Sequence, residues 1–179
     1  MATVVNTYAR AFAEVVMAKH LDVVNTLAET EQISALVAEN KQLREVWEAP
    51  SILVTQKRAV LDAIVGHLGV SVWVRNFLAV LIDRGRIRLL PEIVARFRNE
   101  LNQRLGVAEA EITTMRQLTR EEQSILEAQL ARTVGKRIQA HYQQEASILG
   151  GVVARVGSTV YDGSLKTQLE RIRQQIVSA

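Results

Sequence analysis

The stretch ILGGVVARVGSTVYDGSLKT, residues 148–167, holds the residue types that come closest to a phosphate-binding loop. Such a loop has the pattern Gly-x-x-x-x-Gly-Lys-Ser/Thr, in which backbone N–H groups and the lysine converge on the phosphates. Here Gly157 and Gly163 are separated by five residues, Ser164 stands in place of the lysine, and Lys166 follows two positions late. The spacing therefore argues against nucleotide binding.

The same glycines have a structural interpretation. Gly150-Gly151 does not begin a Gly-x-Gly-x-x-Gly dinucleotide motif. Glycine is also typical of bulges, tight turns and close strand approach. We expect a turn at Gly157, and Asp162 and Ser164 compete as N-caps of a C-terminal helix.

No other residue pattern indicates an enzyme. The histidines His20, His67 and His141 lie on different expected elements and have no partner at metal-ligand spacing. The chain has no cysteine, which excludes disulfides, thiolate metal sites and a cysteine nucleophile. HExxH, Gly-x-Ser-x-Gly and paired-carboxylate signatures are absent from the sequence. We expect no catalytic residue, no metal and no cofactor.

The composition is that of a folded, mainly helical protein. Hydrophobic residues make up 48% of the 179 residues but aromatic residues only 4%, so Val, Leu, Ile and Ala must build most of the core. The net charge of +3 is low for a dedicated nucleic-acid binder. No apolar run approaches the ~20 residues needed to span a bilayer. The N-terminus also lacks the basic and apolar regions of a secretory signal.

A helical period runs through residues 1–105. Apolar residues recur at i, i+3, i+4 and i+7, and the breaks coincide with capping residues. Thr55 and Ser71 suit N-caps, Gly69 and Gly85 suit helix ends, and Pro91 suits a first turn. The pattern predicts a six-helix bundle, with helices at about 4–19, 22–39, 43–47, 55–69, 71–85 and 91–105.

After Gly106 the apolar period changes to that of strands. Alternating apolar residues predict three strands, at Ala108, Ala110 and Ile112, at Ile138, Ala140 and Tyr142, and at Val152, Ala154 and Val156. Thr119 and Glu122 form a capping box for a helix between the first two strands. A final helix would carry Leu165, Leu169, Ile172 and Ile176. Residues 106–179 are thus expected to form a small α/β unit, and the whole chain to be mainly α with a small α+β part.

Two of the expected helices have more apolar surface than one buried stripe explains. The first is apolar nearly all round, and the fifth, VWVRNFLAVLI, is polar only at Arg75 and Asn76. A helix of this kind is buried on two sides or carries a binding face. The sequence leaves two possibilities open: simple burial, or a groove between the two helices that binds a partner helix, with Ala9 and Ala13 allowing close approach.

An arginine-rich run, DRGRIRLLPEIVARFR, follows the fifth expected helix. Its arginines are Arg84, Arg86, Arg88, Arg96 and Arg98. They would suit RNA or an acidic partner, although a solvated helix junction explains them better. RNA binding by the Arg84–Arg98 cluster is therefore the alternative function.

Three blocks of sequence, in their order and spacing, resemble the delta subunit family of the bacterial F-type ATP synthase, which includes the mitochondrial oligomycin-sensitivity-conferring protein. The blocks are Tyr8-Ala9-Arg10-Ala11-Phe12, Asn76-Phe77-Leu78 through Asp83-Arg84-Gly85-Arg86, and residues 149–157 leading to Asp162-Gly163-Ser164 and Leu169-Glu170-Arg171. The last block is the most specific, and the resemblance covers the whole chain.

The resemblance implies a stator subunit that is not itself catalytic. Residues 1–105 would sit on the catalytic head and hold the N-terminal helix of an alpha subunit in a groove between the first and fifth helices. The residues expected in this groove are Tyr8, Ala9, Phe12, Ala13, Asn76, Leu78 and Arg84. Residues 106–179 would contact the b subunits of the peripheral stalk. Their structural motif would consist of Gly150, Gly151, Arg155, Gly157, Asp162 and Ser164.

In that family the link lets the head resist rotor torque during proton-driven ATP synthesis. The resemblance places the protein at the cytoplasmic face of the inner membrane, attached only through the complex. It implies no cofactor and no nucleic-acid partner.

Overall fold

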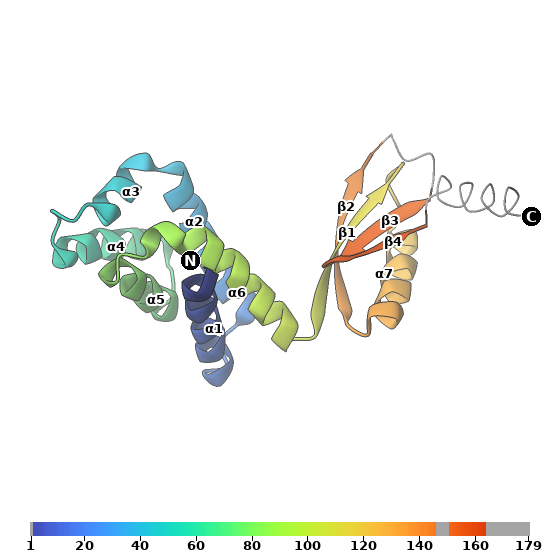
Figure 1. Ribbon diagram of the computed structural model, residues 1–179, viewed down its shortest axis with the longest axis horizontal. Helices are drawn as coiled ribbons and strands as arrows, with labels where there is room; N and C mark the ends of the chain where they lie inside the picture. The colour runs from blue at the N-terminus through green and yellow to red at the C-terminus, as the bar shows by residue number, and fades with distance from the viewer. Residues whose placement is uncertain (1, 146–150, 164–179) are drawn as a thin grey trace, which may run out of the picture. The chain divides into compact units, whose positions relative to one another are not determined.

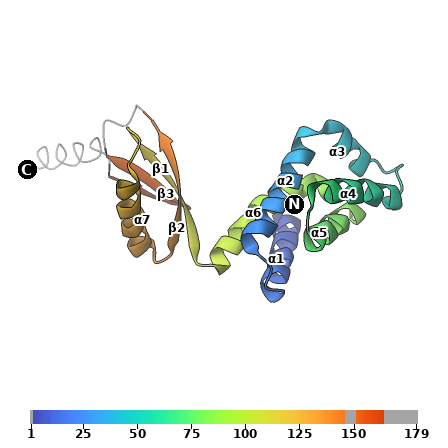
Figure 2. The same ribbon diagram turned by 180° about the vertical axis from the view of Figure 1, so that it is seen from behind.

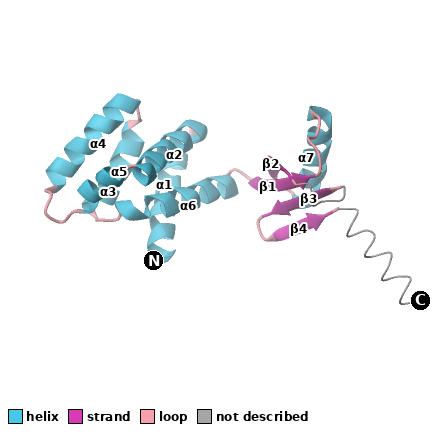
Figure 3. Cartoon of the chain, turned by 90° about the horizontal axis from the view of Figure 1, so that it is seen from above, coloured by secondary structure: helices cyan, strands magenta, loops and turns pink. Residues whose placement is uncertain are grey.

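The computed structural model describes residues 2–145 and 151–163. The chain divides into two compact units between Leu101 and Asn102. We call the part up to Leu101 the helical unit and the part from Asn102 the sheet unit; Figure 3 shows strands in the second only. The protein is therefore mostly helical with a small sheet.

Six α-helices and one short 3-10 helix precede the first strand (Figure 1). They are α1 (Ala2–Ala18), α2 (Val23–Glu39), α3 (Lys41–Glu48), α4 (Val54–Leu68), α5 (Val72–Asp83), η1 (Ile87–Leu89) and α6 (Leu90–Arg104). The helical stretches predicted from the apolar period agree with these bounds to within a few residues. The 3-10 turn η1 was not predicted, because three residues are too few to show a period.

Side-chain caps start several of these helices. The Asp22 carboxylate accepts a hydrogen bond from the Asn25 N–H at 3.0 Å, and the Ser71 hydroxyl accepts one from the Val74 N–H at 3.5 Å. The prediction of Thr55 as the N-cap of α4 was wrong. The N-cap is Leu53, whose N–H donates to the Gln56 side-chain oxygen at 3.3 Å. The Gln56 side chain thus reaches back to accept from the backbone N–H of the N-cap residue, and the N-cap residue itself supplies no side-chain cap.

The core of the helical unit draws side chains from every one of its helices. Trp47 and Phe97 are its largest fully buried residues. The Trp47 indole N–H donates to the Lys57 carbonyl oxygen at 3.2 Å, so the indole is buried without an unsatisfied donor. Burial of this apolar surface is the main term that holds the helices together.

The sheet unit contains four strands and one helix within its described residues. They are β1 (Val107–Thr114), α7 (Arg120–Val134), β2 (Arg137–Gln144), β3 (Val152–Val156) and β4 (Thr159–Asp162). The strand order is β2-β1-β3-β4. β1 and β2 are parallel and connected through α7, whereas β1–β3 and β3–β4 are antiparallel. The sheet is therefore mixed.

α7 covers one face of this sheet (Figures 1 and 2). The small core between them consists of Ala110, Ile112, Leu130 and Ala154. The strand residues that alternate with these buried ones, such as Glu111 and Arg155, are exposed on the other face of the sheet. The alternation expected from the sequence is thus confirmed in β1, β2 and β3.

β4 is a strand that the alternation of apolar residues does not predict. It follows β3 after the turn at Gly157, whose φ is +59°, and Val156 pairs with Thr159. Asp162 ends this strand, and the Gly163 N–H donates to the Val152 carbonyl oxygen at 2.9 Å. The predicted final helix lies outside the described residues.

The capping box predicted for α7 is confirmed. The Thr119 hydroxyl accepts from the Glu122 N–H at 3.3 Å, and the Glu122 carboxylate accepts from the Thr119 N–H at 2.9 Å. Arg116 also donates to this carboxylate at 3.0 Å. The Arg116 hydrogen bond, followed by that of Thr119, lowers the pKa of Glu122 from 4.5 to about 2.

Replacing Glu122 with glutamine should change how the stability of the sheet unit depends on pH. Because the folded-state pKa lies below the unfolded value, ionised Glu122 stabilises the fold above about pH 4.5, and this contribution is lost as the pH falls toward about 2. We expect E122Q to lose less stability than the unmodified chain between these values. Amide hydrogen exchange of β1 from pH 6 to 2 measures this. S124A, at an exposed position of α7 that carries no titratable group, should retain the original pH profile.

Candidate functional site

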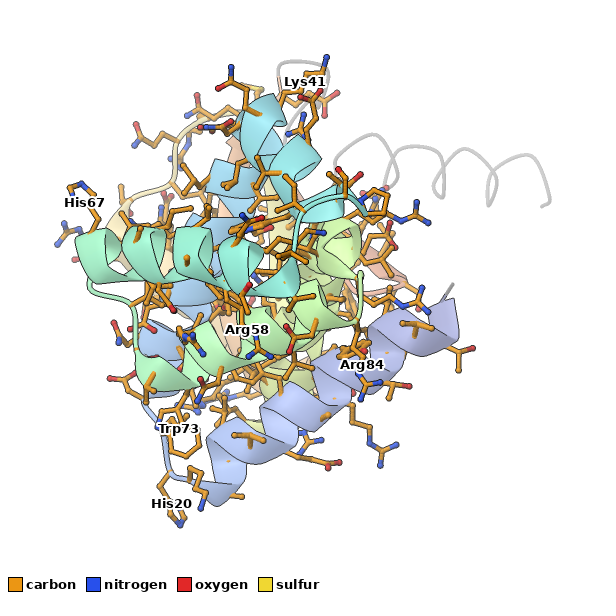
Figure 4. The ribbon with its side chains drawn as sticks, turned by 90° about the vertical axis from the view of Figure 1, so that its left-hand side faces the viewer. His20, Lys41, Arg58, His67, Trp73 and Arg84 are labelled. Atoms are coloured by element: carbon orange, nitrogen blue, oxygen red, sulfur yellow. The ribbon has the colours of Figure 1, made fainter. Side chains whose placement is uncertain are left out.

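α1 and α5 run antiparallel and are in direct contact. The rings of Phe12 and Phe77 stack with centroids 4.1 Å apart and an interplanar angle of 5°. Phe12 also lies 4.8 Å from Phe97 of α6. Just after the end of α1, the Lys19 ammonium lies 5.9 Å from the ring centroid of Trp73, at the start of α5. Figure 4 shows Trp73 close to this end of α1. Three aromatic rings and a cation–π contact therefore fix this pair of helices.

Two ion pairs hold α5 against α4 on its other side. Arg58 donates to Asp83 at 2.9 Å, and Arg75 donates to Asp62 at 2.7 and 3.0 Å. Each pair is bidentate, which restricts how far one helix can slide along the other. The hydrogen bonds from Arg75 and Arg58 lower the pKa of Asp62 and Asp83, respectively.

An exposed, partly apolar surface runs along α1 and α5. On α5 the spacing of Trp73, Phe77 and Val80 places all three on one helix face, and Trp73 and Val80 are 37% and 46% exposed. On α1, Val15 is 37% exposed. We use the name α1–α5 surface for the following residues: Tyr8, Ala11, Val15, Trp73, Asn76, Phe77 and Val80. Exposed apolar residues grouped in this way are typical of a binding face.

Several residues predicted to contact a partner are buried instead. Ala9, Ala13 and Leu78 have no exposed surface, and Phe12 is only 4% exposed. Ala9 and Ala13 therefore let helices of this chain approach α1 closely, and do not face an incoming helix. Periodicity predicted a groove on α1 and α5 but did not separate the inner face of these helices from their outer face.

The other predicted groove residues are accessible. Tyr8 is half-buried and packs against the core. Asn76 is exposed, and its side-chain oxygen accepts a hydrogen bond from Arg75 at 3.2 Å. Arg84 is exposed and is the C-cap residue of α5. These three residues lie on or beside the α1–α5 surface.

The sheet unit has an open hollow of about 370 Å³ where α7 begins. Met115, Leu118, Leu126 and Val152 give it an apolar lining, and Met115 is 55% exposed. The Arg116–Glu122 ion pair forms its polar rim, and Gly151 from the predicted structural motif also lines it. The hollow therefore combines an apolar lining with a charged rim.

The remaining residues of the predicted motif are distributed over β3 and β4. Arg155 is exposed on β3, Gly157 occupies the turn and Asp162 ends β4. Gly151 and Gly157 have φ values of +90° and +59°, which favour glycine. Gly150 and Ser164 lie outside the described residues.

Within the arginine cluster, Arg84, Arg86 and Arg88 are exposed, whereas Arg96 and Arg98 form ion pairs. Arg98 donates to Glu31 at 2.9 Å, and Arg96 donates to Glu100 at 2.8 Å. Both arginines are thus engaged within the helical unit. The comparisons reported below give no support to RNA binding.

Residues 2–145 and 151–163 contain no group of three or more His, Asp or Glu side chains arranged to hold a metal ion. In the same residues, no helix combines the length and hydrophobicity that crossing a membrane requires.

An apolar helix face in one unit and an apolar hollow in the other are features of a subunit that works within a larger assembly. The family model described as "ATP synthase delta (OSCP) subunit" matches residues 4–176. ATP synthase subunit delta of Koribacter versatilis is 47% identical over 176 residues, 98% of each chain. The corresponding protein of Acidobacterium capsulatum is 38% identical, also over 98% of each chain. The chain therefore belongs to the ATP synthase delta (OSCP) subunit family.

This membership agrees with the resemblance seen in the sequence and makes the chain a stator component of the peripheral stalk of an F-type ATP synthase. The fold is also similar to that of a chain in the mitochondrial ATP synthase hexamer of Toxoplasma gondii. The TM-score is 0.64 at 19% identity, over 97% of each chain. At that identity the likeness concerns the fold alone.

Proposed function

We propose that residues 1–105, the helical unit with the end of α6, bind the N-terminal helix of an alpha subunit of the catalytic head along the α1–α5 surface. Residues 106–179, from the first strand onward, would bind the b subunits of the peripheral stalk. The chain would act as a non-catalytic link that holds the head against rotor torque. In a bacterial cell this link would lie at the cytoplasmic face of the inner membrane, held there by the complex.

The observation that carries the first contact is the exposure of Val15, Trp73 and Val80 on two adjacent helices. An amphipathic helix binds by laying its apolar face along such a surface. The Phe12–Phe77 stack and the two Arg–Asp pairs hold α5 in place before the partner arrives. A preorganised surface loses less conformational entropy on binding, which suits a static link.

The second contact is supported by the hollow beside α7. Its apolar lining of Met115, Leu118 and Leu126 would receive apolar side chains from a stalk helix, and Arg116 and Glu122 would border the contact. The two proposed contacts use residues of different units. A single chain could therefore bind both partners at once.

The proposal is tested with V80E and M115E, which place a carboxylate at each proposed contact. Both side chains are exposed, at 46% and 55%, so the fold should tolerate the change. We expect V80E to weaken binding of a synthetic alpha-subunit N-terminal peptide at least about tenfold, because a central apolar contact is replaced by an unpaired charge. M115E should do the same for a peptide from the C-terminal end of b.

Each variant is the matched control for the other. V80E should bind the b peptide normally, M115E should bind the alpha peptide normally, and circular dichroism should show unchanged helix content in both. Titration calorimetry on the full chain gives the affinities. If V80E binds the alpha peptide as tightly as the unmodified chain, the α1–α5 surface is not the contact.

A further inference from the structure

The row of side chains that α5 contributes to the α1–α5 surface ends in a cation. Trp73, Phe77 and Val80 share one helix face, and Arg84 continues their spacing by four more positions. The Arg84 N–H donates to the Val80 carbonyl oxygen at 3.1 Å, so the helical turn extends to this residue. Trp73 and Arg84 therefore mark opposite ends of α5 (Figure 4), and the exposed guanidinium group of Arg84 borders the apolar row.

The other end of the α1–α5 surface also carries a cation. α1 and α5 are antiparallel, so the residue that follows α1 lies at the start of α5. This residue is Lys19, which is exposed and whose ammonium lies 5.9 Å from the Trp73 ring centroid. Lys19 also continues the exposed row of α1, four positions after Val15. The apolar surface thus runs between two positive groups.

These two cations differ from the other charged side chains of α1 and α5, which form ion pairs: Arg10 with Glu14, Arg75 with Asp62 and Asp83 with Arg58. Within residues 2–145 and 151–163, neither Lys19 nor Arg84 has a carboxylate at ion-pairing distance. Arg84 helps to lower the pKa of the adjacent Asp83, but Arg58 already binds that carboxylate. A partner therefore meets an unneutralised positive charge at each end of the apolar surface.

The spacing of the two cations determines where a partner's own charges must lie. Positions 73 and 84 are eleven apart, and a helix rises about 1.5 Å per residue, so the row is about 16–17 Å long. A partner helix lying along this row covers the same length with about 11 residues, or three turns. Residues separated by three whole turns lie on the same helix face. Both ends of one contact face can therefore meet a cation at once.

We infer that the alpha-subunit helix on the α1–α5 surface carries a carboxylate at each end of its apolar contact face, about 11 residues apart. One carboxylate lies opposite Lys19 and the other opposite Arg84, and the apolar side chains between them cover Phe77 and Val80. This charge pattern presupposes the contact proposed above and adds the feature by which the partner is selected. Lys19 and Arg84 are thereby the specificity-determining residues of the contact.

Charges at the border of an apolar contact act mainly on specificity and on the rate of association. An exposed ion pair by itself adds little affinity, whereas a like charge opposite either cation is repelled. A helix with lysine at the two end positions would thus be rejected even when its apolar face fits. Salt should weaken this selection because it screens exposed charges, and it should leave the apolar contact at Val80 intact.

Charge exchange tests the inference by titration calorimetry of the full chain with a synthetic alpha-subunit N-terminal peptide at low and at high salt. K19E and R84E should each weaken binding roughly five- to tenfold at low salt and much less at high salt. Replacing the facing acidic residue of the peptide with lysine should restore binding to the corresponding variant. Two matched controls should bind normally: K41E on α3, and R86E beyond the turn at Gly85, whose φ is +62°.

The V80E variant separates this inference from the contact itself. If V80E weakens binding but K19E and R84E do not, the surface binds the helix without the charge pattern, and the inference is overturned. If V80E binds normally, the α1–α5 contact fails and the inference fails with it. Weak binding by the charge variants that persists at high salt, or that the lysine peptides do not restore, would assign Lys19 and Arg84 to the fold and would also overturn the inference.

Discussion

Replacing Phe12 with alanine is expected to lower the free energy of unfolding of the helical unit by about 3–5 kcal/mol. The Phe12 ring is 4% exposed and contacts both Phe77 and Phe97. Its removal leaves a cavity between α1, α5 and α6 that rigid helices cannot close. Since a domain is typically stable by about 5–15 kcal/mol, this loss is a large part of the total.

The sequence provides a selective reporter for this experiment. Both tryptophans, Trp47 and Trp73, lie in the helical unit, so tryptophan fluorescence during urea unfolding follows that unit alone. V15A is the matched control, because it shortens an exposed side chain on the same helix and should change stability by less than about 1 kcal/mol. Equal losses for the two variants would contradict the assignment of Phe12 to the core.

A double-mutant cycle isolates the stacked pair. F12A and F77A measured singly and together should show a coupling of about 0.5–1.5 kcal/mol beyond additive loss, as expected for two rings in contact. Additive effects would mean that the stack contributes nothing beyond burial. F12A should also weaken alpha-peptide binding, because the relative placement of α1 and α5 depends on this ring.

Replacing Ile112 with alanine should destabilise the sheet unit by about 2–5 kcal/mol. Ile112 has no exposed surface and lies at the centre of a core of only four buried apolar residues in the described part of this unit. A unit with so small a core has little stability to lose. We therefore expect I112A to leave the sheet unit largely unfolded at moderate temperature.

The measurement compares the two units within one chain. Amide protons of β1 should lose their protection from exchange in I112A, while the tryptophan fluorescence transition of the helical unit stays where it was. V160A, at a 52% exposed position on β4, is the control and should keep β1 protected. A simultaneous shift of the fluorescence transition would show that the two units unfold as one.

Much of the fold could be predicted because periodicity is a local property of the sequence. The helices up to Arg104 and the strands β1, β2 and β3 follow from where apolar residues recur, and the α7 capping box follows from Thr119 and Glu122. β4 was missed because four residues, half of them polar, show no reliable alternation. The prediction of the α4 N-cap was wrong because the capping hydrogen bond is accepted by Gln56, three residues after the N-cap residue Leu53, and not by a side chain at the N-cap itself.

The candidate site was predictable only in part. Excess apolar residues identified the first and fifth helices, but Ala9, Ala13 and Leu78, which were expected at the contact, are buried. The exposed residues are their helical neighbours, Val15, Trp73 and Val80. A helix that is apolar all round gives no local signal for which face is inside, since that depends on which helices pack against it.

The sequence by itself determined the α-helices up to Arg104, the strands β1, β2 and β3, the mismatch with the phosphate-loop pattern and the family resemblance, because each depends on residue types at short spacing. Only the tertiary structure decided that Phe12, Phe77 and Phe97 meet, that α5 is held by Arg58 and Asp62, and that β2 lies at the edge of the sheet. These contacts join residues far apart in the chain. Which of them form depends on how all the helices and strands pack at once, and a local pattern does not contain that information.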